Sequence, residues 1–384
     1  MALEDTYLLP TYEKFPFVLD RGEGCWVWDE DGNKYLDFYG GHAVAAIGHS
    51  PAEVTDAVAK QSGKLLFYSN LVYLRVRAEA AKALVEFCGE KGSQVFFCNS
   101  GAEANENAMR IARCVTGKAK IVAAEGGFHG RTAAAIAATG SKYRKNMSGL
   151  GADIVHVPFG DLAAAAAALE GAAAFLLEPI QSVQGATTAT NEYLQGLEAL
   201  CKKSGALLIF DEVQTGLGRV GAPSARHAFS ARPHLQTFAK ALASGVPAGA
   251  VLAAPEISAK VKPGALGSTF GGGPLACVAI SATLKAILDK NLIENAAEME
   301  ELIRRTFKFS QLKEIRGKGL LLGLALDRQS KPIRDALLAK KILVGGADDA
   351  NVIRLLPPLT VGPTEIGLLR GALEEIFAAE AVAA

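Results

Sequence analysis

The sequence lacks an excess of charge of either sign. Lysine and arginine together number 40, aspartate and glutamate together also number 40, and the formal net charge is +0. Proteins whose main partner is nucleic acid or an anionic membrane usually carry a clear positive excess. The balance therefore argues against both kinds of partner.

Cysteine is also scarce. The six cysteines are scattered, with no Cys-x-x-Cys pair and no cysteine or histidine cluster at the spacing of a metal site. This pattern favours free, mostly buried thiols in a reducing compartment and predicts no bound metal. The N-terminal MALEDTYLLP has two acids and a proline where a secretory signal would be basic and then apolar, and no apolar run approaches the length of a membrane span. We therefore expect a soluble, cytoplasmic protein.

The pattern of apolar runs divides the 384 residues into three parts. Residues 1–45 show two short strand signals around a turn at Asp29 to Asn33, which predicts a small hairpin. Residues 46–273 alternate strand and helix signals, as expected of an α/β domain with a mainly parallel sheet covered on both faces. Residues 274–384 mix strands and helices without strict alternation, which favours a smaller α+β domain that the segment 1–45 joins.

The elements of the larger part follow from this alternation. A helix is expected after Ser50, which has a capping-box partner in Glu53 and a proline at the first helical position. The expected strands are Gln94–Cys98, Lys120–Ala124, Asp153–Val157, Ala173–Leu177, Ala206–Phe210, Leu235–Phe238 and Ala250–Ala253, and further helices are expected at Arg75–Phe87, Ala102–Val115, Asp161–Leu169 and Glu192–Lys203.

Two of these strands deliver charged side chains at their carboxyl ends. The apolar run 206–210 is followed by Asp211 and Glu212, and the run 235–239 is followed by Lys240. Ligands of open α/β sheets bind at the carboxyl edge, so an acid and an amine that arrive there together indicate a site that needs both. A salt bridge between them is the simpler alternative.

The segment from Gly216 to Gly221 reads Gly-Leu-Gly-Arg-Val-Gly and matches the glycine motif of dinucleotide-binding folds. That site also needs a helix that opens directly after the glycines and an acid about twenty residues further on. Pro223 follows closely, and no acid lies between Glu212 and Glu256. The motif therefore predicts a tight loop rather than a nucleotide site.

A second motif, Asn-Ser-Gly-Ala-Glu, lies between a strand and a helix. Ser100 and Glu103 have capping-box spacing, and the amides of Gly101 and Ala102 at a helix N-terminus can hold an anion. Alone, this is an ordinary helix cap. Proteins hold pyridoxal phosphate at three points: the phosphate at a helix N-terminus, and the ring by an acid at one strand end and a lysine at another. The lysine forms a Schiff base, and the acid keeps the ring nitrogen protonated.

Seven blocks, in order, resemble those of the class III (ornithine-type) aminotransferases. They read NSGAEANE (99–106), GGFHGRT (126–132), LEPIQ (177–181), IFDEVQTGLGR (209–219), FAKAL (238–242), GSTFGG (267–272) and IRLLPPL (353–359). The resemblance covers nearly the whole chain. It implies fold type I, the aspartate-aminotransferase type, with a mixed, mostly parallel sheet and a smaller α+β domain, and it implies pyridoxal phosphate as the cofactor.

The resemblance also assigns cofactor contacts. It makes Lys240 the residue that forms the Schiff base and Asp211 the partner of the ring nitrogen. The other expected contacts are Ser100, Gly101 and Ala102 (phosphate), Phe128, His129 and Val213 (ring faces), Glu212 (beside Asp211), Gln214 (phenolic oxygen) and Thr269 (phosphate of the neighbouring subunit).

Two arginines are expected to bind substrate carboxylates, for which a planar guanidinium group is suited. Arg131 resembles the residue that binds the substrate carboxylate at the end opposite the reacting amine. Arg354 resembles the residue that binds the α-carboxylate of glutamate. A salt bridge is the simpler alternative for each. Ser268 would lie near the substrate, and the crossing Thr269 implies a homodimer with shared active sites.

The chain departs from the family pattern in one block. The usual EPIQGEGG has a second glutamate that masks the α-carboxylate arginine, and this chain has Val183 there. We expect a weaker bias against α-amino donors, or a replacement mask from Gln184. His42 stands where acetylornithine enzymes tend to have an apolar residue; it either adjusts specificity or is a packed or solvent-facing histidine.

The short chain, the FHGRT block and the compact N-terminus look most like N-acetylornithine aminotransferases of arginine biosynthesis. We expect transfer of the terminal amine of N-acetylornithine, or a similar ω-amine donor, to 2-oxoglutarate, which gives the semialdehyde and glutamate. Succinylornithine, ornithine, 4-aminobutyrate and a carrier-linked lysine are alternative donors. A pyridoxal phosphate mutase or racemase on the same fold, and a non-catalytic binding protein, are alternative functions.

Overall fold

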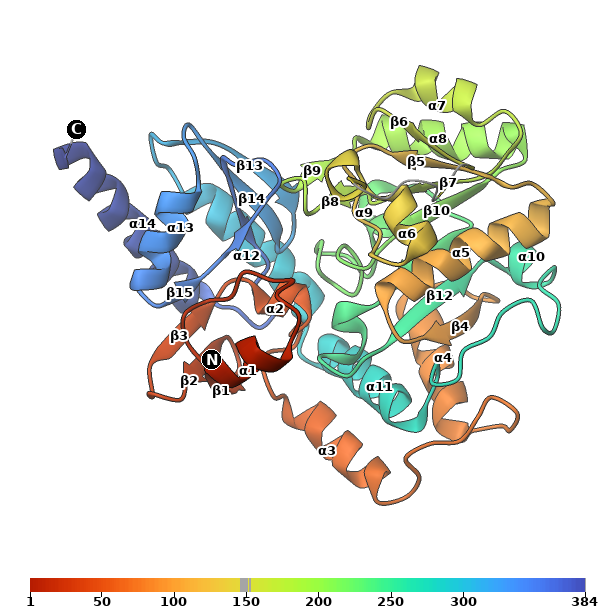
Figure 1. Ribbon diagram of the computed structural model, residues 1–384, viewed down its shortest axis with the longest axis horizontal. Coiled ribbons are helices and arrows are strands. Elements are labelled where there is room, and N and C mark those ends of the chain that lie inside the picture. Colours follow the sequence, from red (N-terminus) through yellow and green to blue (C-terminus); the bar gives the residue numbers. More distant parts are fainter. Residues whose placement is uncertain (146–150, 152, 384) are drawn as a thin grey trace.

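The computed structural model describes residues 1–145, 151 and 153–383, and it consists of two parts that lie side by side (Figure 1). The larger part, on the right in Figure 1, has a central sheet between helices. The smaller part, on the left, combines the red N-terminal strands with the blue C-terminal strands and helices.

A seven-stranded sheet forms the centre of the larger part, in the order β4-β12-β11-β10-β7-β5-β6. β12 runs antiparallel to both of its neighbours, and the other neighbouring pairs are parallel. This confirms the mixed, mostly parallel sheet. The strands are Gln94–Cys98 (β4), Lys120–Ala124 (β5), Ile154–Val157 (β6), Ala172–Leu177 (β7), Leu207–Asp211 (β10), Leu235–Phe238 (β11) and Gly249–Ala253 (β12).

Helices cover both faces of this sheet. α5 and α6 pack on one face, and α7 and α8 pack on the other. The bounds are Ala52–Ser62 (α3), Arg75–Phe87 (α4), Gly101–Thr116 (α5), Ala133–Ala138 (α6), Leu162–Ala168 (α7), Asn191–Ser204 (α8), Ala225–Phe229 (α9), Pro255–Ser258 (α10) and Pro274–Asp289 (α11), with the 3-10 turns Ser141–Tyr143 (η1) and Lys240–Ala243 (η2) and the short strands Ile180–Gln181 (β8) and Thr187–Thr188 (β9).

Alternation along the strands explains why most of their positions are apolar, and why β7 and β12 are apolar throughout. In β5, Ile121 and Ala123 belong to the cluster with α5, whereas Val122 and Ala124 belong to the cluster with α8. Successive side chains of a strand point to opposite faces, so a sheet covered on both faces needs apolar residues at every position.

Glycines follow the ends of two of these helices and an aspartate caps the start of a third, whereas one expected cap is absent. Gly117 after α5 and Gly205 after α8 have φ values of 69° and 66°, in the left-handed region that suits glycine. The side chain of Asp161 caps α7, in which six consecutive alanines follow Leu162. The expected capping box at Ser50 is wrong, because an N-cap needs an extended backbone and Ser50 has φ 47°.

The smaller part joins both ends of the chain. β15 pairs in parallel with β3, and a second sheet has the order β13-β14-β17-β16. We propose the division into 1–45 and 274–384 on one side and 46–273 on the other, which this pairing supports; α11 packs on α3 and α4 and connects the two. The bounds are Ala2–Tyr7 (α1), Leu19–Glu23 (β1), Trp26–Asp29 (β2), Lys34–Asp37 (β3), Gly40–Ala43 (α2), Leu292–Thr306 (α12), Leu312–Lys318 (β13), Leu321–Leu326 (β14), Lys331–Ala339 (α13), Ile342–Leu343 (β15), Gly345–Gly346 (β16), Val352–Leu355 (β17) and Pro363–Ala383 (α14).

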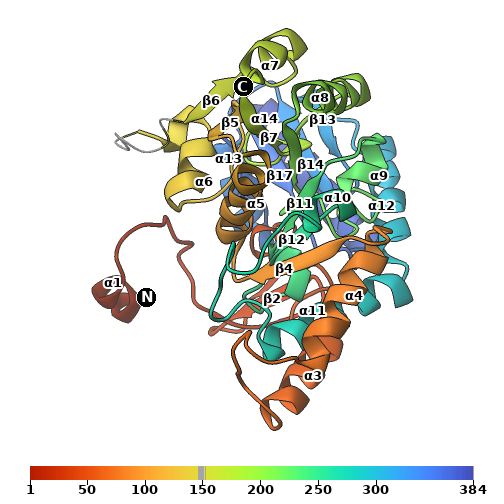
Figure 2. The same ribbon diagram turned by 90° about the vertical axis from the view of Figure 1, so that its right-hand side faces the viewer.

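The N-terminal helix α1 stands apart from the rest of the molecule (Figure 2) and has no buried residue. The expected hairpin is confirmed: β2 and β3 are antiparallel, and the Asp29 carboxylate accepts a hydrogen bond from the Asn33 amide at 2.7 Å. In the part of the chain that the structure describes, no helix has the length and apolar character needed to cross a membrane.

The glycine-rich loop from Gly216 to Gly221 forms tight turns, and no helix opens at its last glycine. Leu217 and two of the glycines have positive φ values. Arg219, at the centre of the loop, is 1% exposed and donates hydrogen bonds to the carbonyls of Leu320 and Pro357. Because both carbonyls belong to the smaller part, Arg219 ties the two parts together.

Replacement of Arg219 by alanine should destabilise the protein. The variant loses two hydrogen bonds and leaves a cavity beside two buried carbonyls, which together cost about 3 kcal/mol of the free energy of unfolding. Arg305, an exposed arginine on α12, gives the matched control, and Arg305→Ala should change that free energy by less than about 0.5 kcal/mol. Urea titration measures both variants, and equal midpoints would contradict the role of Arg219.

Candidate active site

The carboxyl ends of β10 and β11 meet at one cavity. Asp211 is the last residue of β10, and Lys240 opens η2, two residues after β11. Both line a cavity of about 340 Å³, together with Ser100, Gly101, Ala102, Phe128, His129 and Val213. Asp211 and Lys240 are not within ion-pair distance of each other, so the simple salt bridge between them is wrong.

Asp211 is held by three hydrogen-bonding partners. Its Oδ2 accepts from Asn105 Nδ2 at 2.6 Å and lies 2.8 Å from His129 Nδ1, and its Oδ1 accepts from the Val213 amide at 3.0 Å. Asn105 is held in turn, because its Oδ1 accepts from the Thr237 hydroxyl at 2.7 Å. A carboxylate that is 2% exposed needs such partners, and here they fix its orientation.

Lys240 is an amine with an altered acidity. Burial lowers the pKa of Lys240 from 10.5 to about 8; the charges of Asp211 and Glu178 oppose this shift, and the charge of Arg354 adds to it. The residue also has a left-handed backbone, with φ 45°. Strained backbone of this kind persists where the surroundings hold it firmly, which is common at active sites.

The N-terminus of α5 forms one wall of the cavity. Ser100 caps the helix as expected, with its Oγ accepting from the Glu103 amide at 3.2 Å. The amides of Gly101 and Ala102 come before the first intrahelical hydrogen bond and are therefore open donors. A Cβ on Gly101 would lie 3.0 Å from both methyl groups of Val213, so the absence of a side chain lets these two walls approach.

Phe128 lines the cavity, and the carboxylate of Glu178 holds its backbone in place. The Phe128 amide donates to Glu178 Oε1 at 2.8 Å, and the Ser182 amide donates to Glu178 Oε2 at 3.4 Å. Burial, together with the charge of Asp211, raises the pKa of Glu178 to about 7. Glu178 therefore links the Phe128 turn to the segment that carries Ser182.

Arg354, in β17, is 7% exposed and has only neutral partners in the described residues 1–145, 151 and 153–383. Its guanidinium group donates to Ser182 Oγ at 3.2 Å, to Tyr39 Oη at 3.3 Å and to the Gly346 carbonyl at 2.5 Å. The salt-bridge alternative for Arg354 is therefore wrong.

Gln214 does not line the cavity, and its Oε1 accepts from Ser182 Oγ at 3.0 Å. Ser182 thus connects Gln214 with Arg354. Gln184 lines a separate cavity of about 430 Å³ and is not among the hydrogen-bond partners of Arg354, so the structure does not show the expected replacement mask from Gln184.

Arg131 is exposed and lies against two aromatic rings. Its guanidinium carbon is 4.7 Å from the ring centre of Tyr143 and 5.5 Å from that of Phe128. The Tyr143 hydroxyl donates to Asp348 at 2.9 Å, and Lys142 pairs with the same carboxylate oxygen at 2.6 Å. Within the described residues no carboxylate pairs with Arg131, so the salt-bridge alternative is wrong here as well.

Six residues expected to contact the cofactor or substrate lie outside the cavity lining: Arg131, Glu212, Gln214, Ser268, Thr269 and Arg354. The carboxylate of Glu212 accepts from the Thr215 hydroxyl and the Ala225 amide, so it turns away from the cavity. We propose a structural role for Glu212 in place of the expected cofactor contact. Ser268 accepts a hydrogen bond within its own loop, and Thr269 is exposed and has no hydrogen bond to the described part of the chain.

Asn105 is the main residue that the sequence reasoning missed. It lies on the buried face of α5, beside Ala104 and Ala108, and is 1% exposed. A polar side chain on the apolar stripe of an amphipathic helix needs a buried partner. The helical spacing of Asn105, four residues after Gly101, therefore held a signal that pointed to the cavity.

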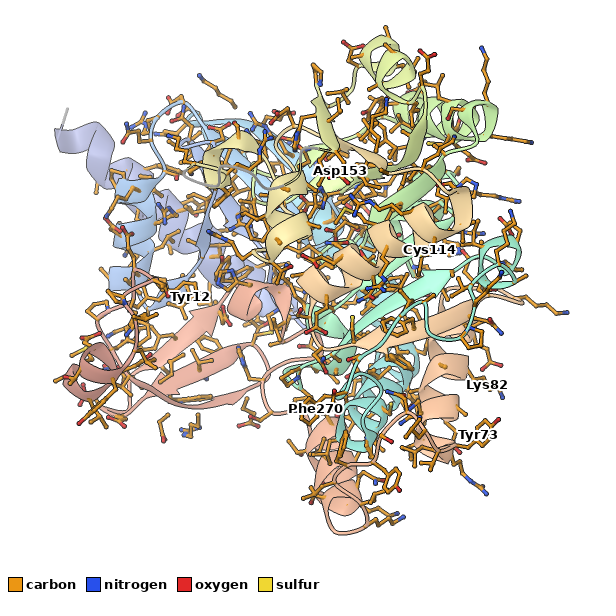
Figure 3. All side chains as sticks on the ribbon, turned by 45° about the vertical axis from the view of Figure 1, so that its right-hand side comes forward. Tyr12, Tyr73, Lys82, Cys114, Asp153 and Phe270 are labelled. Carbon is orange, nitrogen blue, oxygen red and sulfur yellow. The ribbon has the colours of Figure 1, made fainter. Side chains whose placement is uncertain are left out.

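The lowered pKa of Lys240 should be visible in its reactivity. Only the neutral amine is acetylated, so in protein free of cofactor the acetylation rate should rise with pH up to about 8 and level off above about 9. Competitive labelling with acetic anhydride, read by mass spectrometry, measures this rate. Lys82, an exposed lysine on α4 that Figure 3 labels, gives a reference in the same sample. A rate that still rises tenfold per pH unit above about 9 would contradict the shift.

The chain resembles known proteins over almost its whole length. The family model of the class-III aminotransferases matches residues 7–377. The acetylornithine aminotransferase of Methanothermobacter thermautotrophicus is 40% identical over 373 residues, which is 95% of each chain. The acetylornithine aminotransferase of Bacillus subtilis is 39% identical over 378 residues, which is 97% of each chain.

Solved structures share the fold. The ornithine aminotransferase of Toxoplasma gondii has a TM-score of 0.93 at 29% identity and covers 100% of this chain and 95% of its own. The acetylornithine aminotransferase of Elizabethkingia anophelis has a TM-score of 0.84 at 31% identity and covers 98% of both chains. From the family match and the coverage of 95% of each chain, it follows that the chain belongs to the class-III aminotransferases.

Proposed function

We propose that the chain is a pyridoxal-phosphate-dependent aminotransferase that moves the terminal amine of N-acetylornithine to 2-oxoglutarate, a step of arginine biosynthesis. The relatives of 39% and 40% identity support this donor, because both are acetylornithine aminotransferases. The observation that carries the proposal is the meeting of Asp211 and Lys240 at one cavity, near two arginines without a carboxylate partner in the described chain.

The residues around the cavity fit pyridoxal phosphate. The open amides of Gly101 and Ala102 suit a phosphate, which binds well at helix N-termini. Asp211 suits a ring nitrogen that carries a proton, and Lys240 suits an aldehyde. The cavity of about 340 Å³ lies in the range of small-molecule sites.

When bound, pyridoxal phosphate supplies the electron sink that allows a carbon–hydrogen bond beside the substrate amine to break. The residues of the chain do the rest. Lys240 Nζ, whose pKa is lowered to about 8, takes the proton from that carbon and returns it. The Asp211 carboxylate, fixed by Asn105 and His129, holds the proton at the ring nitrogen.

The two arginines divide the substrate carboxylates between them. We assign the carboxylate of N-acetylornithine, far from its reacting amine, to Arg131, which lies against the Tyr143 ring at the surface. We assign the α-carboxylate of glutamate and of 2-oxoglutarate to Arg354, whose charge contributes to the lowered pKa of Lys240. The exposed position of Arg131 suits the carboxylate of the long donor N-acetylornithine. The buried position of Arg354 suits the α-carboxylate of the shorter glutamate.

A homodimer is part of the proposal, since Thr269 has no partner in the described chain and would serve the site of a second copy. Its neighbour Phe270 is 64% exposed, and Tyr73 is fully exposed; Figure 3 shows both in the lower part of the molecule. Asn70 donates to the Ser268 carbonyl and joins the two loops, and the exposed rings of Phe67 and Phe270 lie 5.2 Å apart. An exposed apolar surface of this kind is typical of an interface. Sedimentation velocity tests this, and a monomer at micromolar concentration would contradict it.

A cytoplasmic location is also proposed. All six cysteines are free, five of them buried, which suits a reducing compartment. Cell fractionation tests the location, and recovery of the protein outside the cytoplasm would contradict it.

Val183 leads us to propose a weak bias against α-amino donors. Val183→Glu adds a carboxylate close to Ser182, a partner of Arg354, and should shift the ratio of the N-acetylornithine to the glutamate half-reaction by about tenfold in favour of N-acetylornithine. Val183→Gln, which has the same shape without the charge, is the matched control. An unchanged ratio of the two half-reactions in Val183→Glu would contradict the proposal.

The function itself is tested by half-reactions of the purified protein with pyridoxal phosphate. N-acetylornithine should remove the long-wavelength absorbance of the bound cofactor faster than ornithine, succinylornithine, 4-aminobutyrate or a carrier-linked lysine, and labelled amine should appear in glutamate. Lys240→Ala should abolish both the absorbance and the transfer, whereas Lys82→Ala should keep both. Retention of the label in an isomer of the donor would indicate a mutase or racemase instead.

A further inference from the structure

The neutral partners of Arg354 leave part of its guanidinium group free. Of its five N–H bonds, the one on Nε is donated to the Gly346 carbonyl, one on Nη1 to Ser182 Oγ and one on Nη2 to Tyr39 Oη. One N–H on each terminal nitrogen therefore remains. Two such N–H groups match the two oxygens of a carboxylate.

Tyr39 is fixed against the strand pair that carries Arg354. Its amide donates to Asp37 Oδ1 at 2.8 Å, and its ring lies against Gly345, where an added Cβ would come within 2.4 Å of a ring carbon. Gly345 is the residue that pairs with Arg354 between β16 and β17. The Tyr39 ring occupies this place because Gly345 has no side chain.

His42 orients the Tyr39 hydroxyl. His42 Nδ1 lies 2.7 Å from Tyr39 Oη, and the two ring centroids are 4.8 Å apart. With a neutral His42 whose Nδ1 carries no hydrogen, the Tyr39 hydroxyl donates to Nδ1 while Oη accepts from Arg354. His42 is exposed, but partial desolvation of its ring and the charges of Lys240 and Arg354 lower its pKa, which favours the neutral ring. The hydroxyl lone pairs then face Arg354.

A strained turn holds these two side chains in place. Gly40, Gly41, His42 and Ala43 have φ values of 57°, 55°, 64° and 64°. The left-handed region is unfavourable for His42 and Ala43, and such strain persists where the surroundings fix it. Gly40 packs so closely on the chain after β17 that an added Cβ would lie 2.7 Å from the Leu356 carbonyl oxygen. The turn is thereby fastened to the strand of Arg354.

No acidic side chain competes for the free edge of Arg354. Val183, next to Ser182, is apolar, and within residues 1–145, 151 and 153–383 no carboxylate lies at ion-pair distance from Arg354. Asp37, the nearest acid in the chain to Tyr39, is occupied by the amides of Tyr39 and Gly40 and by His49.

We propose that Tyr39, oriented by His42, is a positioning residue that keeps the carboxylate-binding edge of Arg354 open for α-amino and α-oxo acid substrates. The proposal rests on the proposed function, in which Arg354 binds the α-carboxylate. The half-reaction with 2-oxoglutarate depends on Tyr39. The half-reaction with N-acetylornithine does not, because the carboxylate of that donor lies at Arg131.

The test compares the wild-type holoenzyme with Tyr39→Phe, which keeps the ring and removes the hydroxyl. The dissociation constant of glutarate, measured by calorimetry, and the KM for 2-oxoglutarate should each rise by about tenfold, the effect of one hydrogen bond to a charged group. The kcat of that half-reaction and both constants for N-acetylornithine should stay within about twofold. Tyr193→Phe, at a buried tyrosine of α8 outside the cavity lining, is the matched control.

Two variants of His42 separate orientation from packing. Asn places an oxygen where His42 has Nδ1 and tolerates a left-handed backbone, so His42→Asn should bind glutarate like the wild type. His42→Leu has no acceptor and should weaken glutarate binding as much as Tyr39→Phe does. In the Arg354→Lys background, Tyr39→Phe should have little further effect, because the two residues act as one unit.

Equal losses in both half-reactions of Tyr39→Phe, or an unchanged glutarate constant, would overturn the proposal. So would His42→Asn behaving like His42→Leu. Failure of the proposed function looks different: the wild type would then transfer no amine from N-acetylornithine, while glutarate binding would still depend on Tyr39.

Discussion

The buried carboxylate of Asp211 is the group on which the site depends. A carboxylate without partners in such surroundings would cost several kcal/mol, so Asn105 and His129 must both be in place. Asn105 comes from α5 and is itself held by Thr237 of β11. A helix, a loop and two strands therefore assemble around one side chain, and the same assembly brings Lys240 to the cavity.

The smaller part of the molecule completes the site by supplying charge. Arg354 arrives on β17, and Tyr39 follows β3; the pairing of β3 with β15 brings the two ends of the chain together. Arg219 fastens the glycine loop of the larger part to the carbonyls of Leu320 and Pro357. The position of Arg354, to which we assign the α-carboxylate, thus depends on how the two parts are joined.

The fold could be foreseen where one physical rule decided the outcome. Strands covered on both faces must be apolar throughout, and Ser100 had a free helix N-terminus to cap. Ser50 had the same spacing but a left-handed backbone, which the sequence does not reveal. Glu212 was placed in the site because it follows Asp211, although neighbours along a strand point to opposite faces. The place of Asn105 on the apolar face of α5 signalled a buried partner but did not identify Asp211, and Tyr39 acts through a contact with a distant segment that spacing does not predict.

The most direct test of the central claim is the protonation state of the ring nitrogen of bound pyridoxal phosphate. The holoenzyme is prepared with cofactor labelled with ¹⁵N at this nitrogen, and the ¹⁵N chemical shift is measured near neutral pH. If Asp211, fixed by Asn105 and His129, holds a proton there, the shift will be that of a pyridinium ion, and Asp211→Asn will lose it. An unprotonated ring nitrogen in the wild-type protein would contradict the account.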